Sequence, residues 1–294
     1  MSSNSGYFVP EQSKWPILAS IAMGLLAYGA AMSITAMSAG RDSVGVYVLG
    51  AGFLVLFYVV FGWFKDQIRE EAEGLHNAQL DASYKQGMLW FIFSEVMFFA
   101  AFFGALFYVR TFTLPWLGGE GEKGISNMLW QGFEATWPLL TTPDNKQFPG
   151  PDAVFSPWSL PLLNTILLIT SSVTLTFAHH ALKDGRRRAL EAWLGLTIAL
   201  AVVFLYFQGY EYYEAYNELG LTLQAGIYGA TFFILTGFHG FHVMLGTVML
   251  FVMLMRCFDG AFSKENHFAF EAVAWYWHFV DVVWVGLYIF VYIL

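Results

Sequence analysis

Seven apolar stretches dominate the pattern of hydrophobic and polar positions along the chain. Each is long enough for a helix that crosses a hydrocarbon core, which takes about 20 residues. Runs such as 43–64 and 268–293 do not alternate apolar and polar residues as strands of a membrane β-barrel do. The pattern therefore predicts an all-α transmembrane protein. The seven predicted spans lie at about 15–38, 43–64, 86–111, 158–182, 189–213, 224–256 and 268–293.

Polar segments divide these spans into two groups. A polar N-terminal tail, residues 1–14, precedes a two-helix transmembrane hairpin at 15–64. A charged segment at 65–85 is expected to be a cytoplasmic linker, and a five-helix transmembrane bundle is expected over 86–294. Within that bundle, residues 112–157 form a turn-rich extracytoplasmic loop, which suits a cap on a neighbouring protein.

The composition excludes several classes of protein. Hydrophobic residues make up 57% of the 294 residues and charged residues only 12%, whereas a soluble domain carries about 25% charged residues. The net charge is −8 and the only tight basic cluster is 186–188, so no nucleic-acid partner is expected. Cys257 is the only cysteine, which excludes an intramolecular disulfide and a cysteine-ligated metal cluster in this chain.

The distribution of lysine and arginine predicts the orientation. If the N-terminus is cytoplasmic, ten of the 14 lysines and arginines fall in cytoplasmic segments and four fall outside. Cytoplasmic loops of membrane proteins carry such an excess. We therefore expect a cytoplasmic N-terminus and, after seven spans, a C-terminus on the opposite side.

Glu95 is the clearest ionisable residue inside a predicted span. It lies ten residues after Lys85 and fifteen before Arg110, or about 15 Å and 22 Å from them along a helix. Its phenylalanine neighbours favour a neutral carboxyl. Either a proton-linked or lipid-facing role, or a packing hydrogen bond to a neighbouring helix, fits this position.

Two groups of polar residues lie in the last two spans. His239 and His242 are three residues apart and share a helical face. A metal or haem there would need a further ligand such as His278 or Asp281, and no spacing indicates one, so no metal is expected. Glu271, His278 and Asp281 form one stripe with His239 nearby. Such a stripe can relay protons, but hydrogen bonds that lock helices together are favoured.

Two further sets lie near span ends. Trp63, Arg69 and Glu70, with Arg256 on the same side, suit a phospholipid headgroup, while a solvated salt-bridge cluster is slightly favoured by the residues alone. At the other side, Glu211 lies in an aromatic belt. It is expected to contact a partner or to cap a helix.

Five ordered segments make the chain resemble the subunit III family of haem–copper cytochrome c oxidases. The resemblance covers nearly the whole chain, and each segment falls on the expected span. The segments are residues 94–99, 161–165, 178–182, 226–242 and 270–281.

The resemblance implies a fold and a role. The fold is two bundles, helices 1–2 and helices 3–7, with a lipid-filled V-shaped cleft between them. The role is that of a non-redox accessory subunit in a proton-pumping complex that passes electrons from cytochrome c to O2. It would stabilise oxidase subunit I and support its proton uptake, with subunit II also in the complex. Haem and copper would be in the partner subunits, and this chain would bind phospholipids and have no catalytic residue.

Residue roles carry over from the family at matching positions. Glu95 matches the family's reactive intramembrane carboxyl, and headgroup contacts carry over to Arg69, Glu70, His242 and Arg256. The carry-over is weaker at His76, because the family usually has a His-His pair there.

Other departures concern packing positions and the branch of the family. Ser172 replaces a frequent glycine and Phe177 a frequent tryptophan. Because the loop at 112–157 is longer than in mitochondrial forms, we expect a bacterial branch in the cytoplasmic (inner) membrane, with a periplasmic C-terminus.

Two alternatives use the same polar residues differently. A stand-alone proton-coupled transporter would be built around Glu95 and the stripe in the last span, but no internal repeat typical of transporters is visible. A membrane enzyme would hold a metal at His239, His242 and His278.

Overall fold

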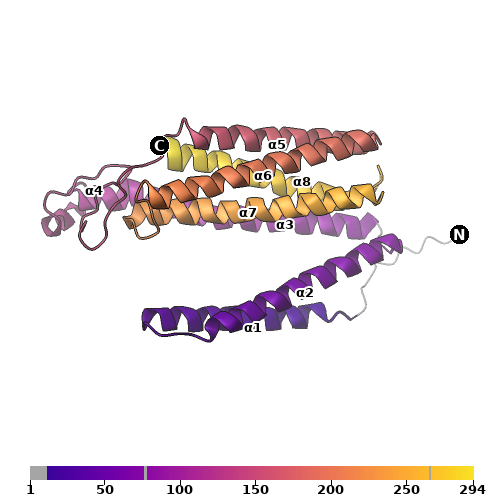
Figure 1. Cartoon of the computed structure of the whole chain (residues 1–294), viewed down its shortest axis with the longest axis horizontal. Coiled ribbons are helices and arrows are strands. Elements are labelled where there is room, and N and C mark those ends of the chain that lie inside the picture. Colours follow the sequence, from indigo (N-terminus) through magenta and orange to yellow (C-terminus); the bar gives the residue numbers. More distant parts are fainter. Residues whose placement is uncertain (1–11, 76–77, 265) are drawn as a thin grey trace. The chain divides into compact units, whose positions relative to one another are not determined.

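The computed structural model describes residues 12–75, 78–264 and 266–294. In this part of the chain, seven helices are long and apolar enough to cross a membrane, and no strand is present (Figure 1). This confirms the predicted all-α transmembrane fold. Residues 1–11 of the expected tail, and His76, lie outside the described residues.

The membrane-length helices agree closely with the apolar stretches, and short elements extend two of them. α3 continues through η1 and α4, and α8 continues through η3. The elements are α1 Trp15–Ser38, α2 Gly45–Ala72, α3 Ala78–Tyr108, η1 Val109–Thr113, α4 Leu114–Leu117, η2 Gly124–Leu129, α5 Leu160–Lys183, α6 Arg187–Asn217, α7 Gly226–Phe258, α8 Phe268–Leu287 and η3 Tyr288–Ile293.

The described residues form two compact units that divide after Gln86. The first unit contains the α1–α2 hairpin. Its helices pack closely at glycines: a Cβ on Gly29 would lie 2.5 Å from the backbone nitrogen of Leu49. At one end of the hairpin the Trp15 indole N–H donates to the Asp66 carboxylate over 2.9 Å.

The expected linker at 65–85 is largely helical. α2 continues to Ala72 and α3 begins at Ala78. The segment is rich in Glu, Gln, Lys, Arg and Ala, which are strong helix formers, and Lys85 pairs with Asp81 one turn away at 2.9 Å. The hydropathy pattern predicts too early an end for α2 and too late a start for α3, because it marks the limits of the membrane core and not those of the helix.

The second unit is a bundle in which α5, α6, α7 and α8 lie side by side with α3 (Figure 1). Its core is centred on α8, where Trp277 and Trp284 are fully buried. Their indole N–H groups donate to the hydroxyls of Ser171 and Thr165 on α5, each over 3.0 Å. Aromatic side chains therefore fill the core, and hydroxyl groups accept the hydrogen bonds of the two buried indole N–H groups.

Residues 118–159, which we call the cap segment, cover one end of this bundle. Leu139 is buried, and the Trp137 ring lies 5.2 Å from that of Tyr228 at the start of α7. The Asp152 amide donates to the Leu219 carbonyl in the α6–α7 loop. The loop expected to cap a neighbouring protein thus packs on its own chain.

The opposite end of the bundle is held by a tight turn and an arginine. Gly185, at φ +74°, ends the short connection between α5 and α6, and a side chain is disfavoured in that conformation. Arg187 then donates to the carbonyl oxygens of Cys257 and Phe258 at the end of α7. These carbonyls lie in the last turn of α7, beyond the reach of the regular helical hydrogen bonds, although the Cys257 carbonyl also accepts from the Gly260 amide at 3.0 Å. Arg187 thus joins α6 to α7.

The Arg187→Ala substitution should destabilise the bundle by about 1 kcal/mol, since it removes charge-assisted hydrogen bonds at a half-exposed helix end. The matched control is Arg188→Ala, because Arg188 is an exposed neighbour. Thermal unfolding of the detergent-solubilised protein would measure both. Equal unfolding midpoints for the two variants would show that the hydrogen bonds from Arg187 to the end of α7 add no stability.

Candidate functional site

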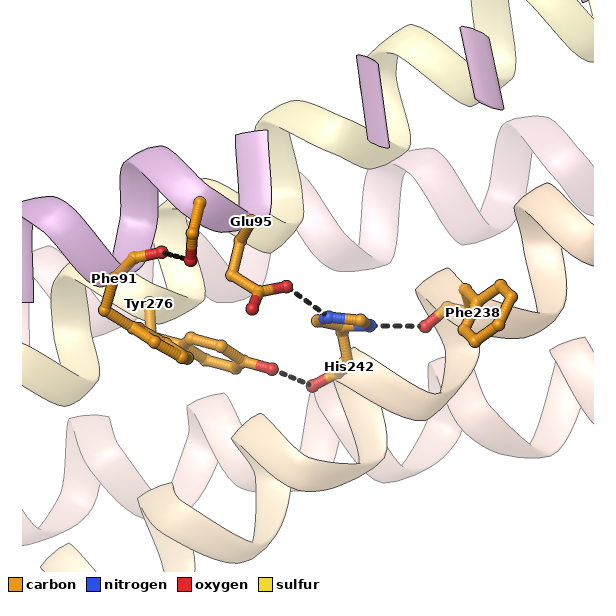
Figure 2. Close-up of polar contacts among 6 residues, drawn as sticks. Phe91, Glu95, Phe238, His242 and Tyr276 are labelled. Atoms are coloured by element: carbon orange, nitrogen blue, oxygen red, sulfur yellow. Dashed lines mark hydrogen bonds and ion pairs between the residues drawn. The ribbon is translucent and has the colours of Figure 1, made fainter. Parts of the chain in front are cut away.

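Glu95 and His242 form a polar pair inside the second unit. Glu95 lies on α3 and His242 on α7, and the Glu95 carboxylate oxygen Oε2 lies 2.9 Å from His242 Nε2 (Figure 2). The His242 side chain is 11% exposed and that of Glu95 is 21% exposed. The hydrogen bond joins two membrane-spanning helices, whichever of its expected roles Glu95 has.

The hydrogen bond of the second ring nitrogen of His242 determines how many protons the pair holds. His242 Nδ1 lies 2.6 Å from the carbonyl oxygen of Phe238 (Figure 2). A carbonyl only accepts, so Nδ1 must donate and carry a proton. The contact between Glu95 and Nε2 then needs one shared proton. With that proton on either atom, the pair has no net charge and suits a site poor in water.

Aromatic side chains enclose the pair. The rings of Phe98 and Phe99 lie 5.9 Å and 5.1 Å from the His242 ring. The Tyr276 hydroxyl of α8 donates to the His242 carbonyl oxygen at 3.4 Å, and the Tyr276 ring stacks on Phe91 (Figure 2). The low polarity of these neighbours strengthens the bond between Glu95 and His242.

The other predicted polar residues bind different partners. His239 is fully buried, and its Nε2 lies 3.1 Å from the Val280 carbonyl oxygen. His278 Nδ1 lies 2.6 Å from the Ser172 hydroxyl. Asp281 and Glu271 are half-buried on α8, and Asp281 interacts with the same Ser172.

The three histidines of the metal-enzyme alternative do not converge. His242 contacts Glu95, His239 contacts Val280 and His278 contacts Ser172. Over the described ranges, no three His, Cys, Asp or Glu side chains gather as a metal site needs. The arrangement of these histidines is that of helix-joining hydrogen bonds.

The residues expected at lipid headgroups are distributed over both units. Trp63 is half-exposed on α2, and its ring stacks on Phe64 at 5.6 Å. Arg69 pairs with Asp66 at 3.5 Å and with Glu73 at 3.8 Å, and Glu70 accepts from Gln67 over 3.2 Å. These charged residues form an exposed cluster along α2.

Arg256 lies near the end of α7, and its guanidinium lies 4.9 Å from the centre of the Phe262 ring. It is fourteen residues from His242, about 21 Å along the helix. These two residues therefore do not share one headgroup position, and each would contact a different part of a lipid.

The structure corrects the interpretation of Glu211. Sequence reasoning placed it in an interfacial belt, in contact with a partner or capping a helix, but it is fully buried. The aromatic pattern around it is the same for an interface and for a core. Tyr292 of η3, distant in sequence, lies beside Glu211 in this core.

Sequence reasoning also missed the partners of two residues. Ser172 was noted only as a departure from the family, and it is the partner of His278. Arg187 was read as part of a basic cluster, and it caps α7. No local pattern indicates either contact, because both partners lie on other helices.

Comparison with known proteins identifies the family of this chain. The pattern of the family described as cytochrome c oxidase subunit III matches residues 5–123 and 127–294. The protein named cytochrome c oxidase subunit 3 from Prototheca wickerhamii is 41% identical, over 97% of this chain and 96% of its own length. Proteins of the same name from Triticum aestivum and Oncorhynchus mykiss are 37% and 38% identical, over 99% and 97% of this chain and 97% and 96% of their lengths. The chain belongs to the cytochrome c oxidase subunit III family.

Proposed function

We propose that this chain is the non-redox accessory subunit of a proton-pumping oxidase that passes electrons from cytochrome c to O2. As a member of the subunit III family it is part of a cytochrome c oxidase complex. The observation that carries the proposal is the family match over nearly the whole chain. In the proposed role it binds phospholipids, contacts and stabilises subunit I and supports proton uptake into that subunit, with subunit II also present.

The polar residues of the bundle support a role without a redox centre in this chain. His242, His239 and His278 are each held by a different protein group, namely Glu95, Val280 and Ser172. In the proposal, haem and copper belong to the partner subunits. The role of this chain is then to pack against its partner subunits, to bind lipid and to keep net charge out of the membrane interior.

Exposed apolar surface supports the lipid-binding part of the proposal. Only 17% of the most apolar stretch of α1, and the same share of α2, is buried, against 56% in α8. Such helices need bilayer or protein around them. Exposed Trp63 and Arg69 near the end of α2 suit the interface with lipid headgroups.

The Arg69→Gln, Arg256→Gln double substitution is expected to lower the amount of phospholipid that co-purifies, because each arginine loses its charge for a phosphate. Phosphorus analysis and lipid mass spectrometry of the complex would measure it. Arg188→Gln is the matched control, an exposed arginine on the same predicted side. Lipid content equal to that of this control would refute headgroup binding by Arg69 and Arg256.

We further propose that the chain lies in a bacterial cytoplasmic membrane with its N-terminus in the cytoplasm. The lysine and arginine count supports this orientation. The cap segment and the C-terminus would then lie on the periplasmic side. Reporter fusions at Leu294 and in the turn after α2 would test the two sides.

Purification of the tagged chain in mild detergent tests the main proposal. We expect two further membrane subunits to co-purify, with haem a-type bands in the reduced-minus-oxidised difference spectrum. The isolated chain, stripped of these subunits, should be colourless. A single chain that purifies alone from a membrane containing active oxidase would instead favour the transporter alternative, and proton-flux assays on Glu95→Gln would follow.

A further inference from the structure

Glu211 and Gln208 form a second buried polar cluster, distinct from the Glu95–His242 pair. They are three residues apart on α6 and therefore share its inner face. Glu211 is 0% exposed and Gln208 is 5% exposed. Both carboxylate oxygens of Glu211 and both amide atoms of Gln208 have no hydrogen-bond partner among the described residues.

Among the described residues, the surroundings of Glu211 supply polar atoms but no cation. The Tyr292 hydroxyl of η3 faces the carboxyl and interacts with it, but the contact lacks the geometry of a full hydrogen bond, which leaves these atoms open to a further partner. The Tyr212 hydroxyl is already bound to Thr236 Oγ1 at 2.7 Å. The other charged group that acts on Glu211 is the acid Glu214.

Arg110, at the same end of the bundle, does not act on Glu211. It donates to the carbonyl oxygens of Phe290 and Leu294 and lies over the Trp137 ring at 5.0 Å. A buried carboxylate without a cation or donors is strongly unfavourable. A neutral carboxyl costs far less, and it can both donate and accept hydrogen bonds.

The unpaired atoms have the composition that bound water requires. Donors and acceptors alternate among the Gln208 amide, the Glu211 carboxyl and the Tyr292 hydroxyl, and a buried water makes about three hydrogen bonds to such groups. A groove of about 310 Å³ between α6 and α7 is lined by Gln208, Tyr212 and the glycines Gly209, Gly237 and Gly240. Of the three groups, the groove reaches only Gln208, where it would give water a route to the cluster.

We propose that Glu211, Gln208 and Tyr292 form a buried water-binding site, in which ordered water joins a neutral Glu211 carboxyl to the Gln208 amide and the Tyr292 hydroxyl. The Trp137 ring of the cap segment lies 5.2 Å from the ring of Tyr228, which is close enough to Glu211 to feel its charge. The ligand is water itself, and the site is independent of the oxidase role proposed above.

Infrared spectroscopy of the purified complex tests the site. The difference between the wild-type protein and Glu211→Gln should contain the carbonyl stretch of a neutral carboxyl, and this band should shift in D2O because bound water exchanges with solvent. The Glu218→Gln control should retain the band, since Glu218 is an exposed acid at the end of the same helix. Absence of the band would mean an ionised Glu211, and a band that does not shift would mean a dry site. Either result overturns the proposal.

A density map of the wild-type complex tests it without any variant. At a resolution that shows ordered water, we expect a peak within hydrogen-bond distance of both the Glu211 carboxyl and the Gln208 amide. Should these two groups bond only protein atoms, the proposal is wrong. This measurement stands even if Glu211→Gln does not accumulate.

Discussion

The Glu95→Leu substitution is expected to lower the stability of the bundle by about 1–3 kcal/mol, the cost of leaving a buried polar atom without its partner. The leucine would leave His242 Nε2 unpaired in an aromatic enclosure, while Nδ1 stays bound to Phe238. Thermal unfolding of the purified complex, followed by subunit retention on a native gel, would measure the loss.

Glu95→Gln is the matched control for this prediction. The glutamine amide can donate to His242 Nε2 and keeps the pair neutral, so assembly and stability should remain close to the wild type. If Glu95→Gln dissociates the complex as Glu95→Leu does, the pair does more than hold helices together, and a role of its proton must be sought.

The Gly29→Leu substitution is expected to open the α1–α2 hairpin. A Cβ at this position would meet the Leu49 nitrogen at 2.5 Å and its Cα at 2.8 Å. Backbone atoms cannot relieve the overlap by rotating, as a side chain can, so the helices must separate. We expect the free energy of unfolding to fall by about 1–3 kcal/mol or more. Hydrogen exchange followed by mass spectrometry should show faster exchange in peptides from both helices.

Gly24→Leu provides the matched control on the same helix. Nothing lies within 4 Å of a Cβ built on Gly24, and both substitutions gain the same helix propensity. Equal protection in the two variants would mean that the close packing at Gly29 does not hold the hairpin together.

The spans could be predicted from the sequence because membrane insertion depends on a local property, the length of an apolar run. The ends of α2 and α3 could not, because polar helix formers continue both helices beyond the apolar run. Hydropathy and helix propensity report different physical quantities, and only the first changes at the membrane surface.

The candidate site was predicted in its residues but not in its pairing. Glu95 and His242 were each singled out, but on separate grounds. Glu95 is ten residues from Lys85, and His242 is fourteen from Arg256, so the two lie at comparable depth from the same predicted side. A comparison of the depths of Glu95 and His242 in the membrane would have suggested that the two residues pair. No such count reveals Glu211, which is buried near Tyr292 of η3, 81 residues further along the chain.

The contacts within each of the two units also set an order in which the chain can fold during synthesis. Gly29 and Gly45 of the hairpin meet soon after both helices have been made, because the contact is local in the sequence. The Trp284 indole, by contrast, bonds Thr165 across 119 residues, so this contact requires α8 to have been made. Until then the Thr165 hydroxyl has only its bond to the Pro161 carbonyl within α5. We therefore expect the hairpin to form early in synthesis and the bundle to close only after α8 has entered the membrane.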